Sequence, residues 1–222
     1  MAGLLDFEIY EDDFVGTSVT LPASANIGTP WLIVDISSAG TPTYVRAGSA
    51  ATLTLAATSE VENVCLAHGD SLAFDIDDIQ RVEMRVKLGA AFTTGSELVF
   101  GVGSAGNDTT DSVAANAWFK MVGANSTSAV YVETDDGTTD NDDKTTGATL
   151  ATAYKEFVID FTGGKSNVKF YVDGVRVAAG TTFDMSGYSS GLQPIVQLQK
   201  AANTNVDAVS IDYVKVISHR RA

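Results

Sequence analysis

Among the places where acidic side chains alternate with other residues, Glu133-Thr134-Asp135 and Asp75-Ile76-Asp77 come nearest to a catalytic pair of carboxylates. Two carboxylates on one face of a strand are the groups that cleave glycosidic bonds, and a complete arrangement would read Glu-x-Asp-x-x-Glu or Glu-x-Asp-x-Glu. The first place runs into an acidic turn without a third partner, and the second has no glutamate. We therefore interpret both as solvated strand ends and turns.

The sequence contains two histidines, His68 and His219, that could act as a catalytic base. His219 is among the last four residues, where chains fray, and His68 precedes Gly69-Asp70 in a predicted turn. Neither stands beside a recognisable nucleophile. The sequence thus predicts no catalytic residue, and a protein that binds or assembles rather than an enzyme.

Metal binding is the next chemistry to consider. Zinc would need clusters of cysteine and histidine that the sequence lacks. Calcium would need about six to eight oxygen ligands, and the acidic stretch 135–143 offers Asp135, Asp136, Asp140 and Asp142. Its spacing matches no EF-hand, because the glycine comes too early and no glutamate closes the loop. We interpret the stretch as an exposed, solvated loop and keep a structural calcium ion as the alternative; no other cofactor is expected.

Aromatic and basic side chains are the candidates for contacts with a ligand or a partner. Tyr171 opposite Arg176 would form a stacked pair typical of interfaces. Trp118 and Tyr188 could form a platform for a sugar, or equally belong to the core or to a contact between subunits. Arg220 and Arg221 make the carboxyl end basic on an acidic chain; they would contact an acidic partner or, alternatively, serve as a solubilising tail.

Strands must position these side chains, because apolar and polar residues alternate along most of the chain. In 81–88, Val82, Met84, Val86 and Leu88 fall on one face and four charged residues on the other, as in a strand with one face in a core.

The segment 167–179 predicts a hairpin. Asp173-Gly174 suits a type I′ turn, and a two-residue turn there pairs Tyr171 with Arg176. In that register six apolar side chains point the same way: Val168, Phe170, Val172, Val175, Val177 and Ala179.

Further strands are predicted at 31–36, 42–47, 51–56, 97–103, 117–123, 129–134, 154–161, 194–200 and 206–217, while 59–68 reads as a strand or as a short helix. About a dozen strands joined by short polar loops predict an all-β fold of two antiparallel sheets. We expect a single sandwich domain over 13–217, an amino-terminal arm at 1–12 and a basic tail at 218–222.

Composition supports a folded, acidic protein. Of the 222 residues, 45% are hydrophobic and 19% charged, which suffices for a buried core. The net charge of -14 repels phosphate backbones and argues against nucleic acid as a partner. No run approaches the roughly 18 apolar residues of a membrane helix, and the amino terminus lacks the pattern of a signal peptide. We expect a soluble protein made in a cytoplasm, with no membrane partner.

Two segments carry a resemblance to a known fold. The segment 154–161 (YKEFVIDF), a glycine-rich turn and then 168–177 (VKFYVDGVRV) are similar to the late strands of concanavalin A-like (laminin-G-like) jelly rolls. Asp12-Asp13-Phe14 with Trp31, and the segment 51–55, resemble the opening strands, and 209–216 resembles the closing strand. The resemblance implies a jelly-roll β-sandwich. Such domains often carry calcium at a loop rim, and the fold also hosts glycoside hydrolases.

The style of the sequence, which is acidic, rich in Ala, Thr, Gly and Ser and without cysteine pairs, resembles tailed-phage virion proteins with this jelly roll. The resemblance implies a non-enzymatic capsid decoration (cement) protein on the outer surface of a phage head. Its partners would be the major capsid protein and further copies of itself, as a homotrimer. The alternative is a carbohydrate-binding, lectin-like module on a phage fibre, with glycans as its ligands.

Overall fold

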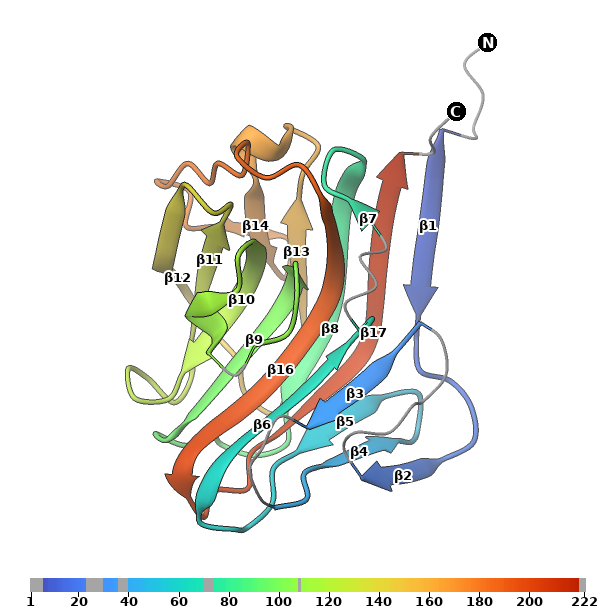
Figure 1. The fold of residues 1–222 in the computed structure, drawn as a ribbon, viewed down its shortest axis with the longest axis vertical. Coiled ribbons are helices and arrows are strands. Elements are labelled where there is room, and N and C mark those ends of the chain that lie inside the picture. Colours follow the sequence, from blue (N-terminus) through green and yellow to red (C-terminus); the bar gives the residue numbers. More distant parts are fainter. Residues whose placement is uncertain (1–5, 23–29, 36–39, 70–73, 108, 220–222) are drawn as a thin grey trace.

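A computed structural model describes residues 6–22, 30–35, 40–69, 74–107 and 109–219, called the described residues below. Its strands form two antiparallel sheets that lie face to face (Figure 1). This confirms the predicted all-β jelly-roll sandwich, and the segment 59–68 is a strand. The helical segments are two short 3-10 turns, η1 (Thr110–Ser112) and η2 (Lys165–Asn167). No helix of the described residues is both long and apolar enough to span a membrane.

The nine-stranded sheet has the order β15-β14-β13-β8-β17-β5-β4-β2, with β1 also paired to β17. Its strands are β1 (Phe7–Asp12), β2 (Val19–Pro22), β4 (Thr43–Arg46), β5 (Ala51–Thr54), β8 (Ile79–Leu88), β13 (Lys155–Asp160), β14 (Lys169–Val172), β15 (Val175–Val177) and β17 (Ala208–His219).

The eight-stranded sheet has the order β12-β11-β10-β9-β16-β6-β3, with β7 paired to β16. Its strands are β3 (Leu32–Asp35), β6 (Glu60–Ala67), β7 (Phe74–Asp75), β9 (Ser96–Gly103), β10 (Asn116–Val122), β11 (Ala129–Asp135), β12 (Asp140–Thr149) and β16 (Gly191–Asn203).

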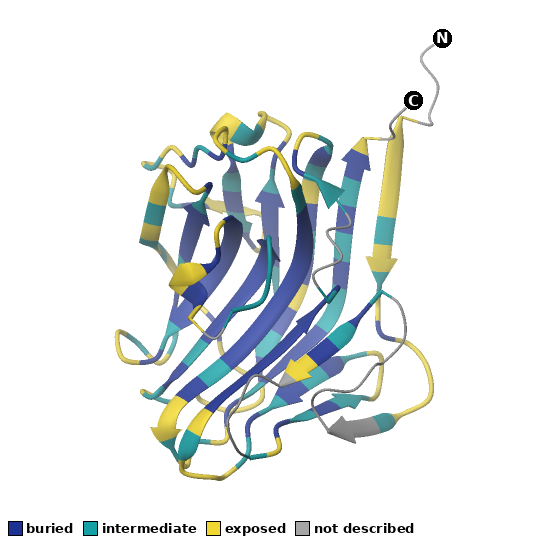
Figure 2. Cartoon of the chain, viewed as in Figure 1, coloured by how far each residue is buried: buried dark blue, intermediate teal, exposed yellow. Residues whose placement is uncertain are grey.

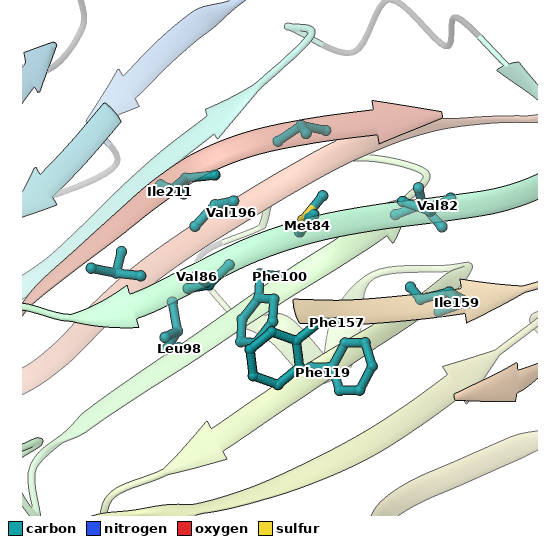
Figure 3. Packing of buried hydrophobic residues seen from close by; sticks show 14 of the residues in the cluster. Val82, Met84, Val86, Leu98, Phe100, Phe119, Phe157, Ile159, Val196 and Ile211 are labelled. Carbon is teal, nitrogen blue, oxygen red and sulfur yellow. The ribbon is translucent and has the colours of Figure 1, made fainter. Parts of the chain in front are cut away.

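The core lies between the sheets, because each strand turns its apolar alternate residues inward. In β8 the four predicted apolar residues are buried, which confirms the sequence pattern. Phe157 of β13 packs against Phe100 and Phe119 of the opposite sheet, with ring centroids 4.8 and 4.9 Å apart (Figure 3). Burial is concentrated in the central strands and decreases toward the edges (Figure 2).

The predicted hairpin is present as β14 and β15, with Tyr171 paired to Arg176 as expected. Of the six apolar residues predicted to point the same way, Val168, Phe170, Val172 and Val177 are buried, whereas Val175 and Ala179 are exposed. Val175 directly follows the turn on the outermost strand of its sheet. The positive φ of 49° at Ala178 ends the alternation before Ala179.

The predicted amino-terminal arm is also corrected. Phe7–Asp12 is strand β1, paired with Val214–His219 of β17 (Figure 1). Trp31 Nε1 donates a hydrogen bond to Asp12 Oδ2 at 2.8 Å, which ties the end of β1 to the sandwich. The predicted basic tail begins within β17, since Ser218 and His219 are paired residues, whereas 1–5 and 220–222 lie outside the described residues.

Candidate functional site

A group of charged side chains surrounds Lys120 on the outer face of the eight-stranded sheet. Strand β10 turns Ala117, Phe119 and Met121 inward, so that Lys120 points outward. The Nζ atom of Lys120 lies 2.6 Å from Asp111 Oδ1, 3.0 Å from Glu133 Oε2 and 3.4 Å from Asp143 Oδ1. These carboxylates come from η1, β11 and β12. We call Lys120, Glu97, Asp111, Glu133 and Asp143 the Lys120 cluster.

The loop between β9 and β10 covers part of this cluster. Thr110 in the loop donates a hydrogen bond to Glu97 on β9, and Val113 packs against Trp118. As a result, the side chain of Glu133 is only 1% exposed, whereas that of Asp111 is 65% exposed. The cluster therefore combines a buried carboxyl group with a carboxylate that solvent can reach.

Burial and charge determine the protonation of the cluster. Burial raises the pKa of Glu133 to about 7, and the neighbouring Lys120 offsets this only in part. Burial also raises the pKa of Glu97, against the hydrogen bond from Thr110. Burial lowers the pKa of Lys120, but its hydrogen bonds with Asp111 and Glu133 outweigh this and hold the pKa above its usual value. The ammonium group therefore stays charged, while Glu133 exchanges its proton near neutral pH.

The spacing of Asp111 and Glu133 follows from their shared partner. Because one oxygen of each contacts the same Nζ at 2.6 and 3.0 Å, these oxygens lie no farther apart than the sum of the two distances. Retaining glycosidases place their two carboxyl groups about 5 to 5.5 Å apart. The upper limit for this pair includes that spacing but does not fix it, and the ammonium group of Lys120 contacts both carboxyl groups.

Two polar atoms beside the cluster are buried without a hydrogen-bond partner among the described residues. They are Trp118 Nε1 and Asn116 Oδ1, in side chains that are each 1% exposed. The Nδ2 atom of Asn116 donates to Glu133 Oε1 at 3.3 Å. Buried polar atoms without partners destabilise a protein and are rare.

The predicted sugar platform of Trp118 and Tyr188 is not assembled. Trp118 lies beneath the β9–β10 loop against Val99 and Val113. Tyr188 packs against the core and donates its hydroxyl to Gly191 O at 3.0 Å. Period-two alternation places a residue on a face of a sheet but does not show whether a loop covers that face.

Of the four predicted calcium ligands, Asp135 ends β11, Asp136 lies buried in the turn that follows, and Asp140 and Asp142 are in β12, so the prediction of one exposed loop over 135–143 is wrong. Asp136 accepts backbone hydrogen bonds from Thr138, Thr139 and Gly187, and Asp135 accepts one from Gly137. Within the described residues, no group of three or more His, Cys, Asp or Glu side chains is arranged to hold a metal ion. The carboxylates at 135 and 136 are used to stabilise the turn.

The structure separates the remaining predicted site residues. Tyr171 lines a hollow on the nine-stranded sheet, and Arg176 is exposed beside it. The cation–π contacts recorded among the described residues join Arg85 and Lys87 to Tyr154, so Tyr171 and Arg176 are neighbours without stacking. Arg220 and Arg221 lie outside the described residues.

Sequence reasoning noticed Glu133 but interpreted it as a solvated strand end, and it missed Lys120, Asp111 and Glu97. One signal was available, because Lys120 is the only charge in the apolar run Trp118-Phe119-Lys120-Met121-Val122. A lone lysine in such a run is either on an open face or held by a buried carboxylate. His68 is buried among Tyr10, Trp31 and Phe74, and burial lowers its pKa to about 4.

Comparisons with known proteins reveal the fold but no family. No protein-family model matches the chain, and no curated protein matches it. Among solved structures, the laminarinase from Rhodothermus marinus is similar with a TM-score of 0.63 and 11% identity, covering 99% of this chain and 100% of that one. A non-specific endo-beta-1,3(4)-glucanase from family GH16 is similar with a TM-score of 0.60 and 14% identity, covering 99% and 94%. A glycoside hydrolase family 16 endo-glucanase from Bacteroides ovatus has a TM-score of 0.59 and 13% identity, covering 93% and 99%.

These comparisons overturn the expected non-enzymatic capsid decoration protein. The three structures named above are two endo-glucanases and a laminarinase that share the fold of this chain, and nothing among them links the chain to phage virions. The expectation considered only carboxylates that alternate on one strand. In the folded chain the carboxylates of the Lys120 cluster come together from separate segments.

Proposed function

We propose that this chain is a carbohydrate-active protein that hydrolyses glycosidic bonds at the Lys120 cluster. The observation that carries the proposal is the pair formed by Glu133 and Asp111. One is a buried carboxyl with a pKa of about 7, and the other is an exposed carboxylate within reach of the same ammonium group. The fold supports it, since solved structures of this fold include glucan-cleaving enzymes.

The two carboxyl groups take the roles that their surroundings favour. Glu133, protonated below about pH 7, donates its proton to the oxygen of the leaving sugar as the glycosidic C–O bond breaks. Asp111, on the exposed side, attacks the anomeric carbon and forms a glycosyl ester. Water then cleaves the ester and returns a proton to Glu133. Lys120 positions both carboxylates.

Release of reducing sugar from laminarin and from mixed-linkage glucan tests the proposal. We expect Glu133→Gln and Asp111→Asn each to reduce the rate by a factor of about 10² or more, because each removes a group that acts on the bond. Asp212→Asn is the matched control, since Asp212 pairs with Arg85 on the other sheet and leaves the cluster intact.

The pH profile gives a second measurement. The rate should fall as pH rises above about 7, because Glu133 then loses the proton that it donates. A wild-type protein that cleaves neither substrate, or a Glu133→Gln variant with the wild-type rate, would contradict the proposal.

A further inference from the structure

The outer face of the nine-stranded sheet carries a hollow of about 380 Å³. We call it the β13 hollow, because its floor is strand β13. It is lined by Arg81, Glu156, Val158, Asp160, Thr162 and Tyr171. The Lys120 cluster lies on the opposite sheet, so the β13 hollow is a separate feature of the molecule.

The floor and one wall of the hollow are apolar. Val158 is buried at the centre of β13, and Tyr171 of β14 is its direct cross-strand partner. Tyr171 is half-buried, and among the described residues no ring contact or side-chain hydrogen bond involves it. A tyrosine ring on an open face, with its hydroxyl unengaged, offers an apolar surface and a polar tip to a ligand.

Carboxylates stand at both ends of this apolar floor. Glu156 and Asp160 point to the same side as Val158, because residues two apart share a face of a strand. Glu156 Oε2 accepts a hydrogen bond from Tyr213 at 3.2 Å, and Asp160 Oδ1 accepts two from Thr162. In each carboxylate one oxygen accepts hydrogen bonds that fix the side chain. The other oxygen accepts none from the described residues and is available for a ligand.

The charges of the hollow indicate which ligand fits. Arg81 is the direct neighbour of Asp160 on β8, and its Nε atom contacts Glu83 at 2.7 Å. Glu156 and Asp160 offer acceptors for hydroxyl groups, and the cations beside them, Lys169 opposite Asp160 and Arg176 opposite Tyr171, together with Arg81 offset their negative charge, which favours an uncharged ligand. The four residue-to-residue steps from Glu156 to Asp160 span roughly 13 Å at about 3.3 Å per step. This length exceeds one sugar ring, so an oligosaccharide is the ligand of matching size.

We propose that the β13 hollow is a second glycan-binding site, which binds a neutral oligosaccharide with Tyr171 as its platform and Glu156 and Asp160 as hydroxyl acceptors. This inference rests on the proposed function, because both sites would bind glycans. Binding at the β13 hollow does not depend on cleavage at the Lys120 cluster, because the two sites lie on different sheets.

Calorimetric titration with a neutral β-1,3-linked glucose hexasaccharide tests the inference. The protein carries Glu133→Gln, so that the hexasaccharide is not cleaved during the titration. We expect Tyr171→Ala to weaken binding at least tenfold, and Tyr171→Phe to keep most of it because the ring remains. Tyr154→Ala is the control, since Tyr154 directly precedes β13, contacts Arg85 and Lys87 through its ring and does not line the hollow. A hexasaccharide of uronic acids should bind at least tenfold more weakly than the neutral one.

The outcomes separate this inference from the proposed hydrolysis. Equal affinity of Tyr171→Ala and Tyr154→Ala, or tighter binding of the uronic acid hexasaccharide, overturns the second site. If cleavage by the wild type is observed without binding that depends on Tyr171, only the second site fails. If such binding is observed without cleavage, only the proposed hydrolysis fails.

Discussion

At the scale of single residues, two lysines with buried side chains form ion pairs with buried carboxylates. Lys120 holds the carboxylates of its cluster, and Lys200 holds Glu62 at 3.3 Å with neither side chain exposed. Lys200 also donates to Ala56 O and Thr58 O. A buried ion pair contributes little net stability, but breaking it leaves an unpaired charge in the interior.

Removal of Lys200 should therefore be costly. We expect Lys200→Ala to reduce the free energy of unfolding by about 3–5 kcal/mol, because Glu62 remains buried without its ammonium partner. Lys215→Ala serves as the control. Its contacts with Glu11 and Glu83, at 4.0 and 3.8 Å, are partly exposed and should contribute no more than about 1 kcal/mol. Denaturation in urea measures both, and similar losses for the two variants would contradict the prediction.

The raised pKa of Glu133 should make stability depend on pH. The folded protein binds this proton more tightly than the unfolded chain does, so the free energy of unfolding falls as pH rises from about 4.5 to about 7. Glu133→Gln removes the titrating group, and we expect the decline over this interval to be shallower in the variant. Urea denaturation at several pH values measures the difference. Parallel curves for the two proteins would show that Glu133 does not titrate in this range.

At the scale of elements, the packing of β9 against β10 depends on a glycine. Gly101 of β9 pairs with Trp118 of β10 and has a φ of 154°. A Cβ atom at Gly101 would lie 2.5 Å from Ala117 O and 2.7 Å from Trp118 Cα. These are backbone atoms of a paired strand, so they cannot move aside without disturbing the position of Lys120 on the same strand.

We expect Gly101→Ala to lower the free energy of unfolding by about 1–3 kcal/mol, as overpacking does elsewhere. Gly180→Ala is the matched control, because a Cβ atom there meets nothing within 4 Å. Thermal unfolding followed by circular dichroism compares the two. A Gly101→Ala variant as stable as Gly180→Ala would mean that β9 and β10 adjust freely.

At the scale of the whole molecule, one continuous core joins both sheets. A single cluster of buried apolar residues includes Val82 and Met84 of one sheet and Phe100 and Val196 of the other (Figure 3). The closing strand β17 pairs with β1, β5 and β8, so segments from both ends and the middle of the chain depend on one another. The described residues should therefore unfold as one unit.

We expect a single cooperative transition in urea, with tryptophan fluorescence and far-ultraviolet circular dichroism giving the same midpoint. Trp31 and Trp118 are suitable probes because they lie far apart along the eight-stranded sheet, just before its edge strand β3 and on β10, with β9, β16 and β6 between them. Two separate transitions would contradict the single core.

The sequence by itself determined the class of fold, the alternation of β8 and the register of the β14–β15 hairpin. These features are local, because side-chain direction alternates with period two and a two-residue turn fixes the pairing beside it. Only the tertiary structure decided that β1 is a paired strand, that Trp118 is covered, and that Asp111, Lys120 and Glu133 meet. Those contacts depend on which strands become neighbours and on where the β9–β10 loop lies. The apolar–polar alternation of a single segment predicts neither.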